Sequence, residues 1–137
     1  VKNELIADLG VEEKDGYKDV FDLKLSAPNQ FPFQKKKLIN PHAEFLKRTL
    51  LPAVTAVTVN QITTSKKKAE LYAAKYKADI ENMEGAAVHY VCLRENIPFV
   101  QIRSISNFVG DRNKKNWKLK EAVNNLNKEL IRLVESL

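Results

Sequence analysis

The stretch VTAVTVN, at residues 54–60, is the strongest strand signal in the chain. Its side chains are apolar or β-branched at almost every position, which is typical of a strand buried in a parallel sheet. Ser65 follows shortly after it and is a favoured N-cap residue for a helix. One face of that helix would carry Ala69, Tyr72, Ala73 and Tyr76. A buried strand that leads into a one-sided helix indicates an α/β fold.

Strand patterns elsewhere in the chain support this fold class. PFVQIRSISN, at residues 98–107, predicts a second strand, with Pro98 at the first position, where proline is tolerated. Residues 1–40 are weakly periodic and rich in loop residues. Within them VFDLKL (20–25) alternates like a short strand, and APNQFPF (27–33) is typical of an exposed loop. Strands that alternate with helices favour a mixed, largely parallel sheet flanked by helices.

Three further helices are expected. Asn40 and Pro41 supply an N-cap and a first-turn proline for a helix that runs to about Leu51. Pro52 then ends it. The run after Asn82 is apolar on several faces and predicts a deeply buried helix. The apolar stripe of a closing helix would consist of Leu119, Ala122, Leu126, Leu130, Leu133 and Leu137.

Length and composition fit one globular domain of 137 residues, with 44% hydrophobic and 29% charged residues. No run of about 18 apolar residues and no secretory leader occurs, so we expect a cytoplasmic protein without membrane spans. The net charge of +6 includes lysine clusters at 35–37, 66–68 and 114–115, but no aromatic or glycine pattern of a nucleic-acid module accompanies them. One cysteine and two isolated histidines predict no metal site.

Three polar segments follow predicted strands or begin a predicted helix, where α/β sheets place their ligand sites. They include Gln61-Ile62, Met83-Glu84 and Ser106-Asn107. Glu84 has two readings. It can be an acid that is favoured at a helix start by the helix dipole. Alternatively, since Gly85 and Ala86 leave room beside it, its carboxylate can accept hydrogen bonds from the paired hydroxyls of a sugar.

These motifs resemble a known family. ENMEGAA (81–87) followed by IPFVQIRSISN (97–107) is similar to the C-terminal half of the nucleoside phosphorylase and methylthioadenosine nucleosidase superfamily. Within it, SISNFVGDRNKKNW (104–117), ADLGVEEKDGYKDVFDLKL (7–25) and FPF (31–33) most resemble the futalosine hydrolases. The resemblance implies the C-terminal part of a three-layer fold, with residues 1–137 forming part of a single domain and no cofactor.

The resemblance also implies roles for the residues around the sugar and the base. Glu84 would grip the 2′ and 3′ hydroxyls of a ribose, with Met83 packed against the sugar. Asn107 stands where adenine-specific relatives carry an aspartate. Its amide, both donor and acceptor, suits a 6-oxopurine such as hypoxanthine. Gln61 and Ile62 would line the purine.

Other implied contacts are less specific. Ser106 joins the expected substrate-binding residues, and Phe31 and Phe33 would reach the site of a neighbouring subunit in a homodimer. Without the resemblance, Phe31, Phe33 and Met83 would be expected to serve as core or loop anchors. In the same way, Arg103 would form a structural ion pair, and His89 would be a core histidine whose hydrogen bonds are satisfied.

The reaction implied is hydrolysis of the N-glycosidic bond of a purine nucleoside, namely futalosine in menaquinone biosynthesis. Because Val1 is not Met and VKNELIADLG reads as a continuing polypeptide, we expect a C-terminal fragment that is inactive alone. The water-activating acid would precede Val1. Three alternatives stay open: a purine nucleoside phosphorylase, a methylthioadenosine/S-adenosylhomocysteine nucleosidase, and a non-catalytic module for nucleoside binding or assembly.

Overall fold

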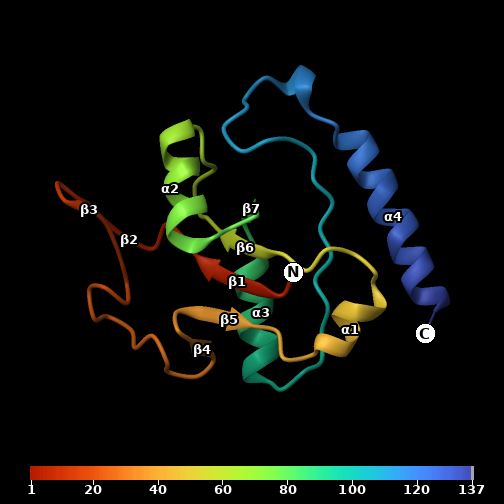
Figure 1. The fold of residues 1–137 in the computed structure, drawn as a ribbon, viewed down its shortest axis with the longest axis horizontal. Coiled ribbons are helices and arrows are strands. Elements are labelled where there is room, and N and C mark those ends of the chain that lie inside the picture. The colour runs from red at the N-terminus through yellow and green to blue at the C-terminus, as the bar shows by residue number, and fades with distance from the viewer. Residues whose placement is uncertain (137) are drawn as a thin grey trace.

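A computed structural model describes residues 1–136, and its central element is a five-stranded mixed sheet (Figure 1). The strand order is β4-β5-β1-β6-β7. Strands β1, β6 and β7 run parallel, whereas β4 and β5 pair antiparallel. The strands are β1 (Asn3–Ile6), β4 (Phe33–Gln34), β5 (Lys37–Ile39), β6 (Thr55–Thr58) and β7 (Ile80–Asn82). The predicted mixed sheet flanked by helices is therefore confirmed.

A separate antiparallel hairpin and the helices complete the described chain. The hairpin consists of β2 (Gly10–Glu13) and β3 (Gly16–Asp19). The helices are α1 (Ala43–Arg48), α2 (Lys66–Tyr76), α3 (Gly85–Arg94), the short 3₁₀ helix η1 (Lys114–Asn116) and α4 (Leu119–Glu135). Within the described residues, no helix is both long and apolar enough to cross a membrane.

The two faces of the sheet differ in chemistry because strand residues alternate in direction. Leu5 and Val57 point to the face covered by α2, where they form a core with Tyr72 and Tyr76. Their neighbours along β1 and β6, including Glu4, therefore point to the opposite face, against which α3 packs. Figure 1 shows α2 and α3 on these opposite sides of the sheet. The α2 face is apolar, and the α3 face carries buried polar groups.

The strand predictions for residues 20–25 and 98–107 are wrong. Residues 20–25 form turns, because Asp19 Oδ1 accepts hydrogen bonds from the backbone N–H groups of Phe21 and Asp22 and so closes a local turn. Within residues 1–136, the run at 98–107 is extended but joins no strand ladder. Its backbone is held by isolated bonds, such as Val1 N to Gln101 O, and it lies outside the sheet in Figure 1. Strand composition produces a strand only where another strand offers matching donors and acceptors.

The description of residues 1–40 as loop-rich is also wrong in part, since they contain β1 to β5. These strands are two to four residues long, and such short segments carry little periodic signal. The start of β1, around Asn3 and Glu4, is polar despite its burial. Pairing with β5 and β6, and not local composition, makes it a central strand.

The helix predictions are confirmed to different degrees. Ser65 caps α2, its Oγ accepting from Lys68 N over 3.1 Å. The first helix is shorter than predicted, because Asn40 Oδ1 accepts from His42 N in a turn that precedes α1. It ends at Arg48, short of Leu51.

The two C-terminal helices are less buried than predicted. In α3 the residues that face the sheet are buried, whereas Val88, Tyr90 and Val91 on other faces are exposed. The stripe of α4 is largely open, with Ala122 buried and Leu119 and Leu130 exposed. Leu137 lies outside the described residues.

Candidate active site

A polar cavity of about 330 Å³ lies at the carboxyl ends of β6 and β7. It is bounded by the loop after β6, the junction of β7 with α3, and the segment 104–117 that precedes α4. Its lining comprises Ile62, Thr63, Glu81, Asn82, Met83, Ser104, Ile105, Ser106, Asn107, Val109, Gly110, Asp111, Arg112 and Trp117. The three polar segments predicted from the sequence thus meet at one place.

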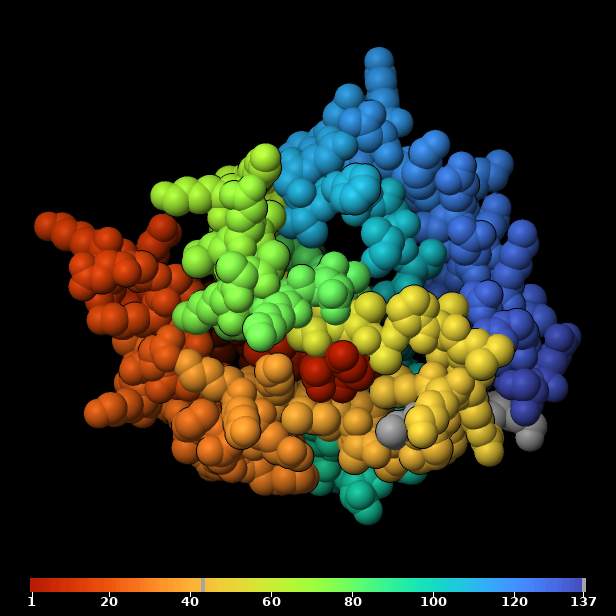
Figure 2. All heavy atoms as spheres, viewed as in Figure 1, coloured from red at the N-terminus to blue at the C-terminus, as the bar shows by residue number. Residues whose placement is uncertain are grey.

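An adjoining cavity of about 430 Å³ extends this space towards α2. The two cavities share Glu81, Ile105, Asn107 and Val109, so Asn107 stands at their common wall. Figure 2 shows a hollow between the green atoms of α2 and β7 and the cyan segment that follows α3. Together the cavities can take a ligand with a base and a sugar, since small-molecule sites range from about 300 to 1,000 Å³.

Glu84 stands at the start of α3, beside the cavity residue Met83. Its own side chain is 71% exposed, and Oε2 lies 3.7 Å from Nη1 of Arg103. The backbone N–H groups of Glu84 and Gly85 donate to Asn82 Oδ1, and Ala86 N donates to Thr58 Oγ1. Other side chains therefore fix the helix start, which leaves the Glu84 carboxylate available to a ligand.

A buried carboxylate, Glu4, underlies this helix start. Its Oε1 accepts hydrogen bonds from Thr58 Oγ1 at 2.8 Å and Asn82 Nδ2 at 2.9 Å. Its Oε2 accepts a longer bond from Gln101 Nε2 at 3.4 Å. Burial raises the pKa of Glu4, and these hydrogen bonds together with the charge of Arg103 oppose that rise.

His89 shares this buried layer. Its Nδ1 lies 2.9 Å from Gln101 Nε2, and its ring meets Phe99 edge-on at 4.7 Å. Burial lowers the pKa of His89 to about 4. The ring is therefore neutral at pH 7 and accepts the Gln101 hydrogen bond. The prediction of a buried core histidine is confirmed, but the prediction that its ring is satisfied is wrong in part, since Nε2 has no hydrogen-bond partner among the described residues.

The amide of Asn107 is oriented by its neighbours. Its Nδ2 donates to Phe108 O over 3.0 Å, and its Oδ1 accepts from Ser106 Oγ over 2.7 Å. Because a carbonyl oxygen can only accept, the nitrogen must face Phe108. One N–H and one oxygen lone pair remain for a ligand, which is the pattern needed to bind a base edge that presents both acceptors and donors.

The loop after β6 is hydrogen-bonded to Asp8, which follows the end of β1. Asp8 Oδ2 accepts hydrogen bonds from Asn60 N over 2.6 Å and from Gln61 N over 2.9 Å. Ile62 lines the cavity, whereas Gln61 is exposed beside it. Of the residues predicted for the site, Ile62, Met83, Ser106 and Asn107 line one cavity and Glu84 borders it.

Phe31 and Phe33 lie elsewhere in the subunit. Phe31 is 60% exposed and lies under the guanidinium of Arg94, near the C-terminal end of α3. Phe33 packs against Phe21 and Tyr90. Within one chain, neither phenylalanine lines the cavity at the other end of α3. Their contact with a neighbouring subunit stays a prediction.

Sequence reasoning missed two acids at the cavity, Glu81 and Asp111. Both carry structural hydrogen bonds: Glu81 Oε1 accepts from Thr63 N, and Asp111 accepts from Asn113 N and Asn116 Nδ2. The Asn116 bond is the main reason that the pKa of Asp111 is lowered. No three His, Cys, Asp or Glu side chains in the described part gather as metal ligands do.

The layer of Glu4, Thr58, Asn82 and Gln101 was missed as well. A signal was available for Glu4, since an acid that directly precedes the apolar run LIA is unusual for a buried strand. Its partners could not be predicted, because they lie on three other segments.

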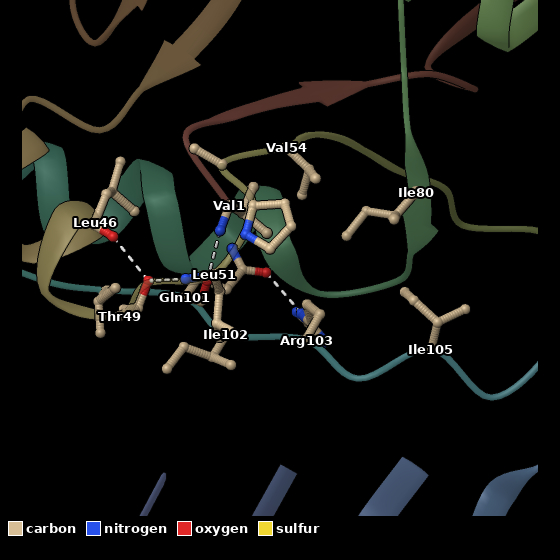
Figure 3. Close-up of a pocket in the computed structure, with 13 residues that line it drawn as sticks. Val1, Leu46, Thr49, Leu51, Val54, Ile80, Gln101, Ile102, Arg103 and Ile105 are labelled. Carbon is tan, nitrogen blue, oxygen red and sulfur yellow. Dashed lines mark hydrogen bonds between the residues drawn. The ribbon is translucent and has the colours of Figure 1, made fainter. Parts of the chain in front are cut away.

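Another cavity, of about 230 Å³, is lined in part by Val1 (Figure 3). Its wall is mostly aliphatic, including Leu46, Val54 and Ile80. Arg103 is a charged residue of this lining, and its Nε already donates a hydrogen bond to Gln101 Oε1 over 2.7 Å. This cavity lacks a carboxylate and is a weaker candidate for chemistry than the polar cavity.

Comparison with known proteins adds sequence relatives. The chain is 30% identical over 135 residues to futalosine hydrolase from Thermus thermophilus, and 30% identical over 118 residues to futalosine hydrolase from Streptomyces coelicolor. These matches cover 98% and 85% of the chain but 59% and 48% of the relatives. The chain thus spans roughly half to three-fifths of their length.

Solved structures share the fold. The chain matches a 5′-methylthioadenosine/S-adenosylhomocysteine nucleosidase and a futalosine hydrolase, both from Helicobacter pylori, each with a TM-score of 0.77. Sequence identity is 18% and 19%, and each match covers 59% of the solved chain. A family model described as the phosphorylase superfamily matches residues 13–137. With this match over most of its length and a fold shared with solved nucleosidases, the chain belongs to the phosphorylase superfamily.

Proposed function

We propose that the full-length protein is a purine nucleosidase that hydrolyses futalosine and releases hypoxanthine, in menaquinone biosynthesis. The observation that carries this proposal is the single cavity lined by Met83 and Asn107 and bordered by Glu84. The identity to two futalosine hydrolases supports the same reaction. The chain would supply the sugar-binding and base-binding groups of the site, as a portion of one domain.

Cleavage of an N-glycosidic bond passes through an oxocarbenium-like state, as in glycoside hydrolysis. In our proposal Glu84 accepts hydrogen bonds from the ribose 2′ and 3′ hydroxyls, and Arg103 holds its carboxylate in place. Met83 packs against the sugar. The fixed sugar then presents its anomeric carbon to water, and an acid outside this chain activates that water.

As the N-glycosidic bond breaks, charge develops on the leaving purine and has to be stabilised by hydrogen bonds from the site. The free N–H of Asn107 would donate to N7 or O6 of hypoxanthine, and its free lone pair would accept from N1–H. Ser106 holds this amide, and Gln61 and Ile62 would lie along the base. General acid catalysis, in which a side chain transfers a proton, is typically worth about 10² to 10⁴ in rate. Because Asn107 gives a hydrogen bond and not a proton, we place it at the low end.

The test is base release by the full-length protein from futalosine, inosine and methylthioadenosine, with and without phosphate. Hypoxanthine from futalosine without phosphate is the expected result. Release that requires phosphate would favour a phosphorylase, and adenine from methylthioadenosine would contradict the role of Asn107. No release from any substrate would favour a non-catalytic binding or assembly module.

The role of Glu84 is tested by Glu84→Gln. Loss of charged hydrogen bonds worth about 1.5–3 kcal/mol each should lower kcat/KM by at least about tenfold. Glu95→Gln, at the other end of α3, is the matched control and should leave kcat/KM unchanged. Equal effects of the two substitutions would contradict the proposed role.

The remaining parts of the proposal concern assembly and location. A homodimer in which Phe31 and Phe33 reach the partner's site would give a particle mass in light scattering that is twice the mass of one full-length subunit. The proposed cytoplasmic location suits a reaction on a soluble nucleoside.

A further inference from the structure

The sheet face beneath α3 holds a charged group that the reaction proposed above leaves unused. Glu4, on β1, has 0% of its surface exposed. The groups that contact its carboxylate are all donors: the Thr58 hydroxyl and the side-chain amides of Asn82 and Gln101. Each of these bonds stabilises the ionised carboxylate and so opposes the burial that raises the pKa of Glu4. A buried charge of this kind costs stability, so its presence needs a reason.

One path leads from Glu4 to the backbone of Glu84. Since Glu4 takes the N–H of the Asn82 amide, the amide oxygen of Asn82 faces the helix. That oxygen accepts from Glu84 N at 3.1 Å and Gly85 N at 2.6 Å. Thr58, which also donates to Glu4, accepts from Ala86 N at 2.8 Å. The first free N–H groups of α3 are therefore satisfied by side chains that Glu4 orients.

A second path leads to the side chain of Glu84. Gln101 Nε2 points at Glu4 and His89, so its Oε1 is turned towards Arg103 Nε, which donates to it over 2.7 Å (Figure 3). Arg103 is in turn the ion-pair partner of Glu84, at 3.7 Å. The orientation of one amide thus links the buried carboxylate to the exposed one.

We propose that Glu4 is a positioning residue for Glu84. It fixes the position of the Glu84 backbone and the orientation of Arg103, the ion-pair partner of Glu84. Together these fix the direction from which the Glu84 carboxylate approaches the paired hydroxyls of the substrate sugar. This inference rests on the proposed role of Glu84. Gly85 is part of the arrangement, because a Cβ there would collide with the Glu4 carboxylate.

Glu4→Gln separates positioning from bulk stability. The variant keeps the size of the side chain and the oxygen that faces Thr58 and Asn82. Its new NH₂ group, however, opposes the NH₂ of Gln101, which must then turn its oxygen inward. Arg103 Nε loses its acceptor as a result. The variant also removes a buried charge, whose desolvation is costly, so we expect the loss of its hydrogen bonds to be offset in stability.

The experiment is a double-mutant cycle in the full-length protein, with futalosine as substrate and kcat and KM measured separately. We expect Glu4→Gln to lower kcat/KM about 10- to 100-fold, by analogy with residues that orient the ligands of metal sites, without lowering the Tm. In the Glu84→Gln background the same substitution should change kcat/KM by less than about twofold. Independent effects that multiply would overturn the proposal.

Asp19→Asn is the control for destabilisation alone. Asp19 is also a buried acid, 2% exposed, but its partners are Lys36, in the turn between β4 and β5, and Lys75, on α2. It should lower the Tm and leave kcat/KM unchanged. If it lowers kcat/KM as much as Glu4→Gln does, the effect of Glu4 is only structural and the proposal fails.

Hydrogen exchange does not depend on catalysis, so it tests the positioning role of Glu4 separately from the proposed hydrolase function. Hydrogen exchange at the amides of Glu84, Gly85 and Ala86 should be faster in Glu4→Gln than in the wild type, because a neutral amide oxygen holds Thr58 and Asn82 more weakly than a carboxylate does. If the wild type cleaves no nucleoside, the proposed function fails while this readout still decides the positioning. Unchanged exchange at all three amides would overturn it.

Discussion

Replacing Thr58 by valine removes a hydroxyl that joins two elements, while the shape of the side chain is kept. Thr58 Oγ1 donates to Glu4 Oε1 over 2.8 Å and accepts from Ala86 N over 2.8 Å. The variant deprives a buried carboxylate of a donor and leaves one helix N–H unpaired. A hydrogen bond to a charged group contributes about 1.5–3 kcal/mol, and an unpaired buried group costs about 1–3 kcal/mol. Since the two losses overlap, Thr58→Val should lower the free energy of unfolding by roughly 3 kcal/mol.

Thr63 provides a matched control. It is 1% exposed, and in the part of the chain that the structure describes its Oγ1 has no hydrogen-bond partner. Thr63→Val removes a hydroxyl that is buried without compensation, so the free energy of unfolding should change by less than about 0.5 kcal/mol or should rise.

Urea unfolding of both variants and the wild-type protein, compared at equal slope m, measures the difference. Equal losses at Thr58 and Thr63 would refute the reasoning, because burial alone would then explain them. A loss below about 1 kcal/mol at Thr58 would refute it too, because a net hydrogen bond to a charge contributes more than that.

Three further predictions concern the base, the pH dependence and the start of α3. Asn107→Asp replaces an N–H donor by an acceptor. In the base-release assay, the ratio of hypoxanthine release from futalosine to adenine release from methylthioadenosine should therefore fall at least about tenfold. An unchanged ratio contradicts this prediction. Burial lowers the pKa of His89 to about 4, whereas the unfolded value is about 6.5, so the unfolded chain binds more protons between these values. The contribution of His89 to the free energy of unfolding should therefore fall as the pH drops from about 6.5 to about 4. His89→Gln should reduce the slope in urea unfolding at each pH, and a variant that keeps the whole slope contradicts this role of His89. Gly85→Ala would place a Cβ against the Glu4 carboxylate and 2.7 Å from Asn82 Oδ1. The free energy of unfolding should fall by about 1–3 kcal/mol, although alanine has the better helix propensity. A Tm at or above that of the wild type would contradict this prediction.

Several features follow from local sequence alone. The β-branched run at 54–60 contains β6, and Ser65 caps the next helix with its own hydroxyl. The polar segments at Ile62, Met83 and Asn107 meet in one cavity. β6 and β7 run parallel and end at the same edge of the sheet, which brings the first two segments there. Each of these outcomes depends on short-range chemistry or on a general rule of parallel sheets.

Other features were decided by contacts between distant parts of the chain. Residues 98–107 have the composition of a strand but join no ladder in the described structure, because pairing depends on a neighbour that local sequence does not specify. The burial of α3 was overestimated for a similar reason, since only its sheet-facing side is covered.

Glu4 shows the difference most clearly. Its sequence neighbours mark it as an unusual acid before an apolar run, and nothing more. Its hydrogen-bond partners Thr58, Asn82 and Gln101 lie 54, 78 and 97 residues further along the chain. A buried charge is stable only where such donors converge on it, and their convergence is a property of the folded sheet. The sequence alone therefore indicated which residues line the candidate site, and the tertiary structure decided which buried groups hold them in place.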